Sequence, residues 1–150
     1  MTAPQLTLVS TLHVDVAAPV VVGETAQGTR RLIPILGGAA TGRLAGRVLP
    51  GGADYQILRR DNVTELEARY VVETQFGLVY VVNHGLRHGP AEAMERLARG
   101  ETVDSALIYF RAAPRFETAA AELQWLTRAL FLCKGARHPA HVELQFYEVL

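Results

Sequence analysis

Apolar and polar residues alternate along most of this chain, and a period of two predicts half-buried β-strands. Residues 64–74 show the pattern most clearly, with Leu66 and Val72 on the apolar parity and Glu65 and Glu73 on the polar one. Strands are predicted over residues 6–16, 30–36, 44–49, 55–59, 64–74, 78–86, 106–112, 116–118, 123–134 and 141–149.

The first predicted strand and the predicted helix have clear sequence signals. One parity of residues 6–16 is expected to face the interior and carries Leu6, Leu8, Leu12, Val14 and Val16. A helix is predicted over residues 90–99, because Pro90 suits a first helical position and Gly100 suits the residue that follows a helix.

Many short strands with one short helix predict an all-β fold, a closed antiparallel β-barrel of about eight strands, in one domain over residues 1–150. Glycines support the barrel over a sandwich. Gly38, Gly42 and Gly46 are four residues apart, so in one strand they would share a face. Repeated glycines on one face let a small barrel turn its corners. A barrel of this size is filled by side chains or holds one small ligand.

Charge and composition exclude several classes of partner. Fifteen basic residues balance fifteen acidic ones, so the basic excess of a nucleic-acid-binding protein is missing. The chain lacks an apolar stretch of about 18 residues that could span a bilayer and lacks a secretory signal, so we expect a cytoplasmic protein with no membrane contact. Cys133, the one cysteine, is expected to be a small buried hydrophobic residue and not a reactive thiol.

Motifs for cofactors and metals are absent or badly spaced. The Gly-rich run over residues 37–52 lacks the Gly-Lys-Ser/Thr of a phosphate loop, and no serine lies in a Gly-x-Ser-x-Gly turn. His84 and His88 are about 13 Å apart if they lie on one strand, which is too far for one ion to bridge. His138 and His141 flank a turn with no evident third ligand. We expect no metal and no cofactor.

Several segments together resemble the bacterial domain-of-unknown-function family 3237, over nearly the whole chain. The resemblance implies a compact closed antiparallel β-barrel without a settled activity. Two departures are Tyr55, where the family often has Trp, and Thr127, where Asn commonly follows the Trp-Leu pair. The matching segments are residues 49–56, 68–70, 83–90, 109–111, 114–118, 125–126 and 147–149.

Two carboxylates are the candidate catalytic residues. Asp54 follows a Gly-Gly turn at the start of a strand, and Glu117 follows Phe116 late in the chain. If both face the cavity, different surroundings would separate their pKa values and let them divide acid and base roles. The alternatives are turn chemistry for Asp54 and an ordinary surface acid for Glu117.

Polar and aromatic side chains provide the candidate ligand contacts. Asn83 and Arg87 share a parity with Val79 and Val81, which puts polar groups at the end of an apolar stripe, as expected at a barrel mouth. Arg69 lies on the polar parity of its strand, so the alternative to ligand binding is an exposed position in solvent. For the aromatic residues the alternative is a structural position in the barrel wall. The candidates are Gln56, Arg69, Tyr80, Asn83, Arg87, Tyr109, Arg111 and Trp125.

These residues favour an enzyme that moves protons on a small organic acid, carbonyl or phenolic compound without a cofactor, as an isomerase, lyase or cyclase does. A non-catalytic barrel that binds a small ligand is an alternative, since fold does not decide function. A structural subunit is another. Residues 123–133 are apolar on both parities, which suits a buried strand or a contact in a homodimer or larger homo-oligomer.

Overall fold

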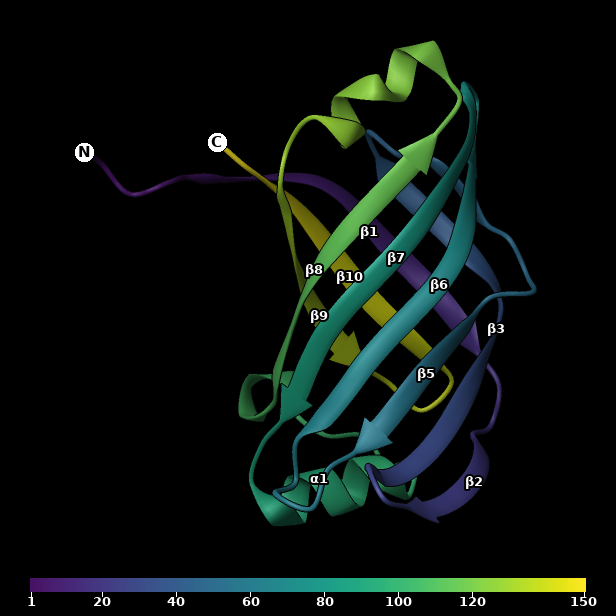
Figure 1. Ribbon diagram of the computed structural model, residues 1–150, viewed down its shortest axis with the longest axis vertical. Helices are drawn as coiled ribbons and strands as arrows, with labels where there is room; N and C mark the ends of the chain where they lie inside the picture. The colour runs from purple at the N-terminus through teal and green to yellow at the C-terminus, as the bar shows by residue number, and fades with distance from the viewer.

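An antiparallel sheet closes on itself to form a barrel in the computed structural model, which describes residues 1–150 (Figure 1). Its strands are β1 (Leu6–Val16), β2 (Val20–Thr25), β3 (Gly28–Gly42), β4 (Gly46–Val48), β5 (Ala53–Leu58), β6 (Thr64–Thr74), β7 (Gly77–His88), β8 (Tyr109–Thr118), β9 (Phe131–Arg137) and β10 (His141–Val149). The ring runs β1–β10–β9–β8–β7–β6–β5–β3 and closes where β3 pairs with β1. The predicted closed barrel is therefore confirmed, with β2 and β4 as two additional strands.

Helical segments cover the two ends of the barrel (Figure 1). Helix α1 (Ala91–Ala98) lies at the end where β5 and β7 finish, and it confirms the predicted helix. The 3₁₀ helix η2 (Ala121–Thr127) covers the opposite end, and η1 (Ser105–Leu107) lies between α1 and β8 in the chain. None of these helices has the length and apolar character needed to cross a membrane.

The barrel core follows the alternation of the sequence. In β6 the side chains of Leu66, Tyr70 and Val72 are buried, as the period of two predicts. Other strands add completely buried residues, among them Val79 of β7 and Phe146 of β10. Burial of such apolar side chains is the main favourable contribution to folding.

Closure of the barrel depends on the close approach of β1 and β3. Gly38 pairs with Val14 and has a φ of 145°, and a Cβ atom at this position would lie 2.0 Å from the carbonyl oxygen of His13. Gly42 also has a positive φ and lies against β1, but Gly46 belongs to β4. The expectation that all three glycines share one strand is wrong, although each allows a close backbone contact.

A β-bulge changes the parity of β1. The pairing of β1 with β10 shifts register between Leu8 and Ser10. One extra residue in a strand moves the residues beyond it to the opposite face. As a result Val9 is buried, whereas Leu6 and Leu8 are about half exposed and the predicted inward position is wrong for both.

The predicted strand over residues 123–134 is wrong in its first half. Residues 121–127 form η2, in which Leu123 and Leu126 lie three residues apart and both face the core. In a 3₁₀ helix residues i and i+3 are on the same side. Only the second half of the segment is a strand, β9, so the apolar character on both parities reflects a change of element and not a strand buried on both faces.

Two other strands differ from the predicted set. The predicted strands 106–112 and 116–118 belong to one strand, β8, which continues through Pro114. The first of them was predicted to begin too early, because residues 105–107 form η1 and β8 begins at Tyr109. Strand β2 was not predicted. It pairs with β3 alone, outside the ring, and its valines Val20, Val21 and Val22 are exposed.

Replacement of Gly38 tests whether its contact with β1 is needed for closure. We expect Gly38→Ala to lower the free energy of unfolding by several kcal/mol, since the new methyl group meets the His13 carbonyl as well as an unfavourable φ. Gly51→Ala is the control, because Gly51 has a φ of 103° but nothing within 4 Å of its Cβ position. It should lose about 1–2 kcal/mol. Urea unfolding measures both, and equal losses would contradict the role of the contact.

Candidate functional site

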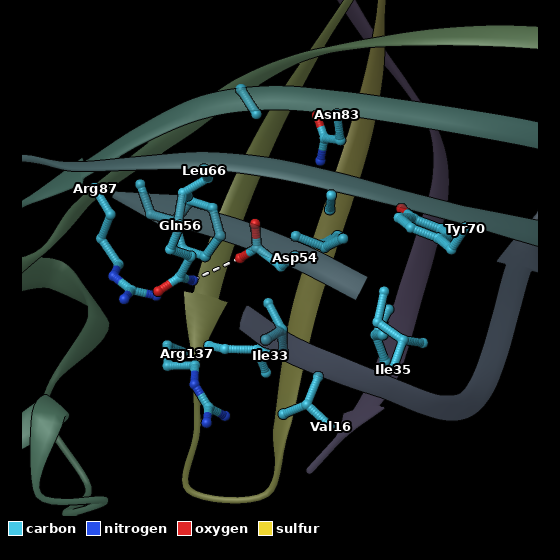
Figure 2. Close-up of a pocket in the computed structure, with 16 residues that line it drawn as sticks. Val16, Ile33, Ile35, Asp54, Gln56, Leu66, Tyr70, Asn83, Arg87 and Arg137 are labelled. Atoms are coloured by element: carbon cyan, nitrogen blue, oxygen red, sulfur yellow. Dashed lines mark hydrogen bonds between the residues drawn. The ribbon is translucent and has the colours of Figure 1, made fainter. Parts of the chain in front are cut away.

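Six charged or polar side chains converge inside the barrel at the end near α1, and Figure 2 shows five of them. Each lies on the inward parity of its strand, so strand periodicity alone directs it to the interior. They are Arg31 of β3, Asp54 and Gln56 of β5, Asn83 and Arg87 of β7, and Arg137 of β9.

A cavity lies among these side chains. Its inner part, here the chamber, has a volume of about 40 Å³ and mostly apolar walls, with Ile35 and Leu144 among its lining residues. A wider outer pocket of about 380 Å³, here the vestibule, lies between the barrel rim and α1, where Met94 and Leu97 line it. Arg87 and Arg137 line both spaces. The chamber therefore adjoins the vestibule at a boundary of positive charge.

Hydrogen bonds hold the carboxylate of Asp54 in place. Gln56 Nε2 donates to Asp54 Oδ2 over 2.6 Å (Figure 2). The backbone N–H of Glu67 donates to Asp54 Oδ1 over 3.0 Å. Gln56 is itself oriented, because its Oε1 accepts a hydrogen bond of 2.7 Å from Arg31 Nε. The orientation of Asp54 thus depends on three strands, β3, β5 and β6.

Burial controls the protonation of Asp54. It raises the pKa of the Asp54 carboxyl above the ordinary value of 3.8, against the opposing effects of the Gln56 hydrogen bond and the charge of Arg87. A carboxyl in such surroundings can take up and release a proton closer to neutral pH than an exposed one.

Arg87 is a buried cation without a full set of partners. Arg87 is 4% exposed, and its Nε has no hydrogen-bond partner. Burial, aided by the like charges of Arg31 and Arg137, lowers its pKa to about 10, so the guanidinium stays charged at neutral pH. The charges of three guanidinium groups, those of Arg31, Arg87 and Arg137, thus interact with one carboxylate, that of Asp54. This imbalance of charge favours an anion in the cavity.

Two more buried polar atoms in the chamber lack partners, Tyr70 Oη and Asn83 Oδ1.

Cys133 is close to Asn83 and is completely buried, and burial raises the pKa of its thiol to about 12. This confirms Cys133 as a small buried residue whose thiol stays protonated at neutral pH.

The structure does not bring Glu117 to this cavity. Phe116 takes the inward parity of β8, so Glu117 is exposed on the outer face, where it pairs across the sheet with Tyr80. Arg69 also lies on the outer face of the barrel. It forms an ion pair with Glu67 at 2.6 Å and donates to Tyr80 Oη over 3.3 Å.

The remaining candidates are also away from the chamber. Tyr109 is exposed, and its ring stacks on His88 with centroids 4.8 Å apart. Arg111 lies beside the same Tyr109 ring, with Cζ 5.3 Å from its centroid. Trp125 belongs to η2 at the opposite end, where the Arg43 guanidinium lies 3.4 Å from its ring centroid. Of the predicted site residues, the chamber therefore brings together Asp54, Gln56, Asn83 and Arg87.

Sequence reasoning missed two of the three arginines. Arg31 shares the parity of Ile33 in β3, and Arg137 shares the parity of Cys133 in β9. Parity was the available signal, since both continue an inward apolar stripe to the same end of the barrel, as Arg87 does.

Comparison with known proteins finds relatives along the whole chain. A family described as protein of unknown function (DUF3237) matches residues 4–149. A UPF0311 protein of Bradyrhizobium diazoefficiens is 46% identical over 143 residues, covering 95% of this chain and 94% of the relative. A UPF0311 protein of Rhodopseudomonas palustris is 50% identical over 130 residues, covering 85% of each.

Crystal structures share the fold. A conserved protein of unknown function from Rhodopseudomonas palustris superposes with a TM-score of 0.94 at 43% identity, covering 100% of this chain and 99% of the other. A protein with unknown function from Clostridium acetobutylicum gives 0.90 at 36% identity, with the same coverage. An enzyme from Penicillium herquei gives 0.70 at 15% identity, covering 100% and 97%, and at this distance the likeness extends to the fold alone.

Titration of Asp54 tests the electrostatics of the site. We expect its carboxyl to titrate above 3.8 in ¹³C NMR, and Arg87→Met to raise that pKa further because a stabilising positive charge is removed. Asp61 is the control, since Arg59 lowers the pKa of this exposed carboxyl. A pKa for Asp54 at or below 3.8 would contradict the account.

The same shift makes the contribution of Asp54 to stability depend on pH. Its pKa is higher in the folded protein than in the unfolded chain, so folding favours the protonated form. The contribution of Asp54 is therefore most favourable below about pH 3.8 and declines as the pH rises through the folded-state pKa. The difference in unfolding free energy between wild type and Asp54→Asn, measured against pH, should decline in this window. A difference that stays flat or grows would contradict the shift.

Proposed function

The chain belongs to the DUF3237 family of proteins of unknown function, and we propose that its barrel binds a small organic anion at Arg87 and moves a proton of that ligand with Asp54. The observation that carries the proposal is the unpaired, buried Arg87 Nε beside a carboxyl whose pKa burial raises.

Anion binding is supported by the charge and geometry of the mouth. A buried guanidinium without a partner is unfavourable, and a carboxylate or enolate oxygen would supply the missing acceptor. Arg31 and Arg137 add positive charge near the same place, while the apolar chamber walls would hold the rest of the ligand. A ligand with one negative group and a short apolar body matches these surroundings in charge and polarity.

Proton transfer is supported by Asp54. In its ionised form Asp54 would remove a proton from a carbon next to a carbonyl group, and the C–H electron pair would become the C=C bond of an enolate. The negative charge would move to the carbonyl oxygen, where the positive field of the guanidinium groups near Asp54 stabilises it. The protonated Asp54 would then return the proton to the same carbon or a different one. The step uses acid–base chemistry alone and gives an isomerisation when the carbon differs.

The distant relative from Penicillium herquei is called an enzyme, so a barrel of this fold is compatible with catalysis. Fold likeness at 15% identity carries no chemistry from one protein to the other. The proposal for this chain therefore depends on its own residues.

Hydrogen–deuterium exchange tests the proton transfer without knowledge of the natural substrate. In D₂O the protein should catalyse exchange of the hydrogens next to the keto group of 4-oxopentanoate. The loss of their ¹H NMR signals measures the exchange rate. Asp54→Asn should reduce the exchange rate by about 10² to 10⁴, the contribution of general acid–base catalysis. The variant keeps the shape of the side chain, but its amide nitrogen faces Gln56 Nε2, so unfolding is measured alongside.

Glu117→Gln is the matched comparison, because it removes a carboxylate from the outer face. We expect it to keep both exchange and binding. If Glu117→Gln loses the exchange activity and Asp54→Asn keeps it, the assignment of Asp54 is overturned. Binding of 4-oxopentanoate without any exchange would make the protein a binding barrel.

Arg87→Met tests the anion site and separates function from stability. Methionine fills similar space without a charge, so binding of small carboxylates should be lost while the free energy of unfolding rises by about 1 kcal/mol or more. Calorimetric titration and urea unfolding measure the two effects. A variant that is less stable but binds carboxylates as well as wild type would give Arg87 a structural role.

A further inference from the structure

We infer that the ligand carries a second oxygen, a hydroxyl or carbonyl, that bonds to Tyr70 at the inner end of the chamber. The inference rests on the proposed function, since it takes Arg87 as the site of the ligand's negative group. It adds the class of ligand, a short molecule with an anionic group at one end and a neutral oxygen at the other.

Strand register places the chamber residues on successive levels along the barrel axis. Asp54 pairs with Ala68 and Ala68 pairs with Asn83, so these three residues form one level. Tyr70 is two residues farther along β6 and lies one level deeper, roughly 7 Å along the strand. Arg87 pairs with Thr64, two levels nearer the mouth.

The picture of the chamber agrees with this order. Figure 2 shows Asp54 between Arg87 on one side and Tyr70 on the other. Ala68 separates Asp54 from Asn83 on their shared level, and its small side chain leaves room there for part of a ligand. The atoms next to Asp54 would thus be the middle of the ligand, flanked by its two polar ends.

The hydroxyl of Tyr70 has no partner within the protein. Its residue is 3% exposed and lines the chamber, and Oη makes no hydrogen bond. A buried hydroxyl without a hydrogen-bond partner is unfavourable, and a phenylalanine would fill the same space without one. A ligand oxygen at this end would satisfy the hydroxyl, and water is the competing explanation that the experiment must separate.

Asn83 strengthens the case for a ligand with mixed polarity. Its residue is buried and its Oδ1 has no partner, one level nearer the mouth than Tyr70. Apolar side chains, including Ile35, Phe110 and Leu144, form the walls between these polar points. Keto acids, hydroxy acids and hydroxylated aromatic acids have this arrangement, whereas a plain fatty or aromatic acid lacks the second oxygen.

Two matched pairs of probes test the inference. Pentanoate differs from 4-oxopentanoate, and benzoate from 4-hydroxybenzoate, by the oxygen far from the carboxylate. Wild-type protein should bind the oxygenated member of at least one pair about 5–10-fold more tightly in calorimetric titration, as one added hydrogen bond provides. Tyr70→Phe should remove that preference and leave the affinity for pentanoate and benzoate unchanged.

Tyr55→Phe is the control, because Tyr55 is exposed and its phenol lies outside the chamber. It should keep the preference. If wild-type protein binds both members of each pair equally, the inference is overturned without any variant. It is also overturned if the preference persists in Tyr70→Phe, because the Tyr70 hydroxyl would then bond to water and not to the ligand. Failure of the proposed function looks different: no carboxylate binds, or Arg87→Met binds them all as wild type does, and the inference then falls with it.

Discussion

Closure of the barrel determines how the interior of the protein can be built. Every strand of the ring has a hydrogen-bonded neighbour on both sides, so backbone groups there are largely occupied by the sheet. The chemistry of the interior must therefore come from side chains. Because side chains alternate between the two faces of a strand, each strand sends one stripe inward, and the residue at the end of that stripe determines what the mouth contains.

At the mouth near α1, three of these stripes end in arginine. Arg31, Arg87 and Arg137 place three positive charges near one carboxylate, Asp54, inside a protein with no formal net charge. A folded protein without a ligand gains nothing from this excess, since desolvation opposes each buried charge. The arrangement is understandable as a binding site that is complete when an anion is present. The same desolvation prepares Asp54 for proton exchange, so one physical effect serves both parts of the proposed function.

Strand periodicity made much of the fold predictable. Residues 64–74 and 141–149 are strands as predicted, because each keeps one parity from end to end. The errors arise where one period gives way to another. The bulge before Ser10 reverses the parity of Leu6 and Leu8, and η2 places two leucines on one side with a spacing of three. Neither change leaves a strong local signal in the sequence.

The candidate site was predictable in part for the same reason. Asn83 and Arg87 could be placed inside because they continue an unbroken stripe of β7. Glu117 could not be placed, since the predicted strands broke near Pro114 and hid the parity that puts Phe116 inside. The convergence of Arg31, Asp54 and Arg137 depends on sheet register between strands far apart in the chain, which a single sequence does not contain.

A crystal structure of the protein with bound 4-oxopentanoate would show whether the unpaired charge at the mouth is an anion-binding site. We expect the carboxylate of the ligand to lie within hydrogen-bond distance of Arg87 Nε, with its carbon chain in the chamber beside Asp54. The crystals would be prepared at a ligand concentration that saturates the protein in solution. A ligand bound elsewhere on the protein, with Arg87 Nε still lacking an anionic partner, would contradict an anion site at the mouth.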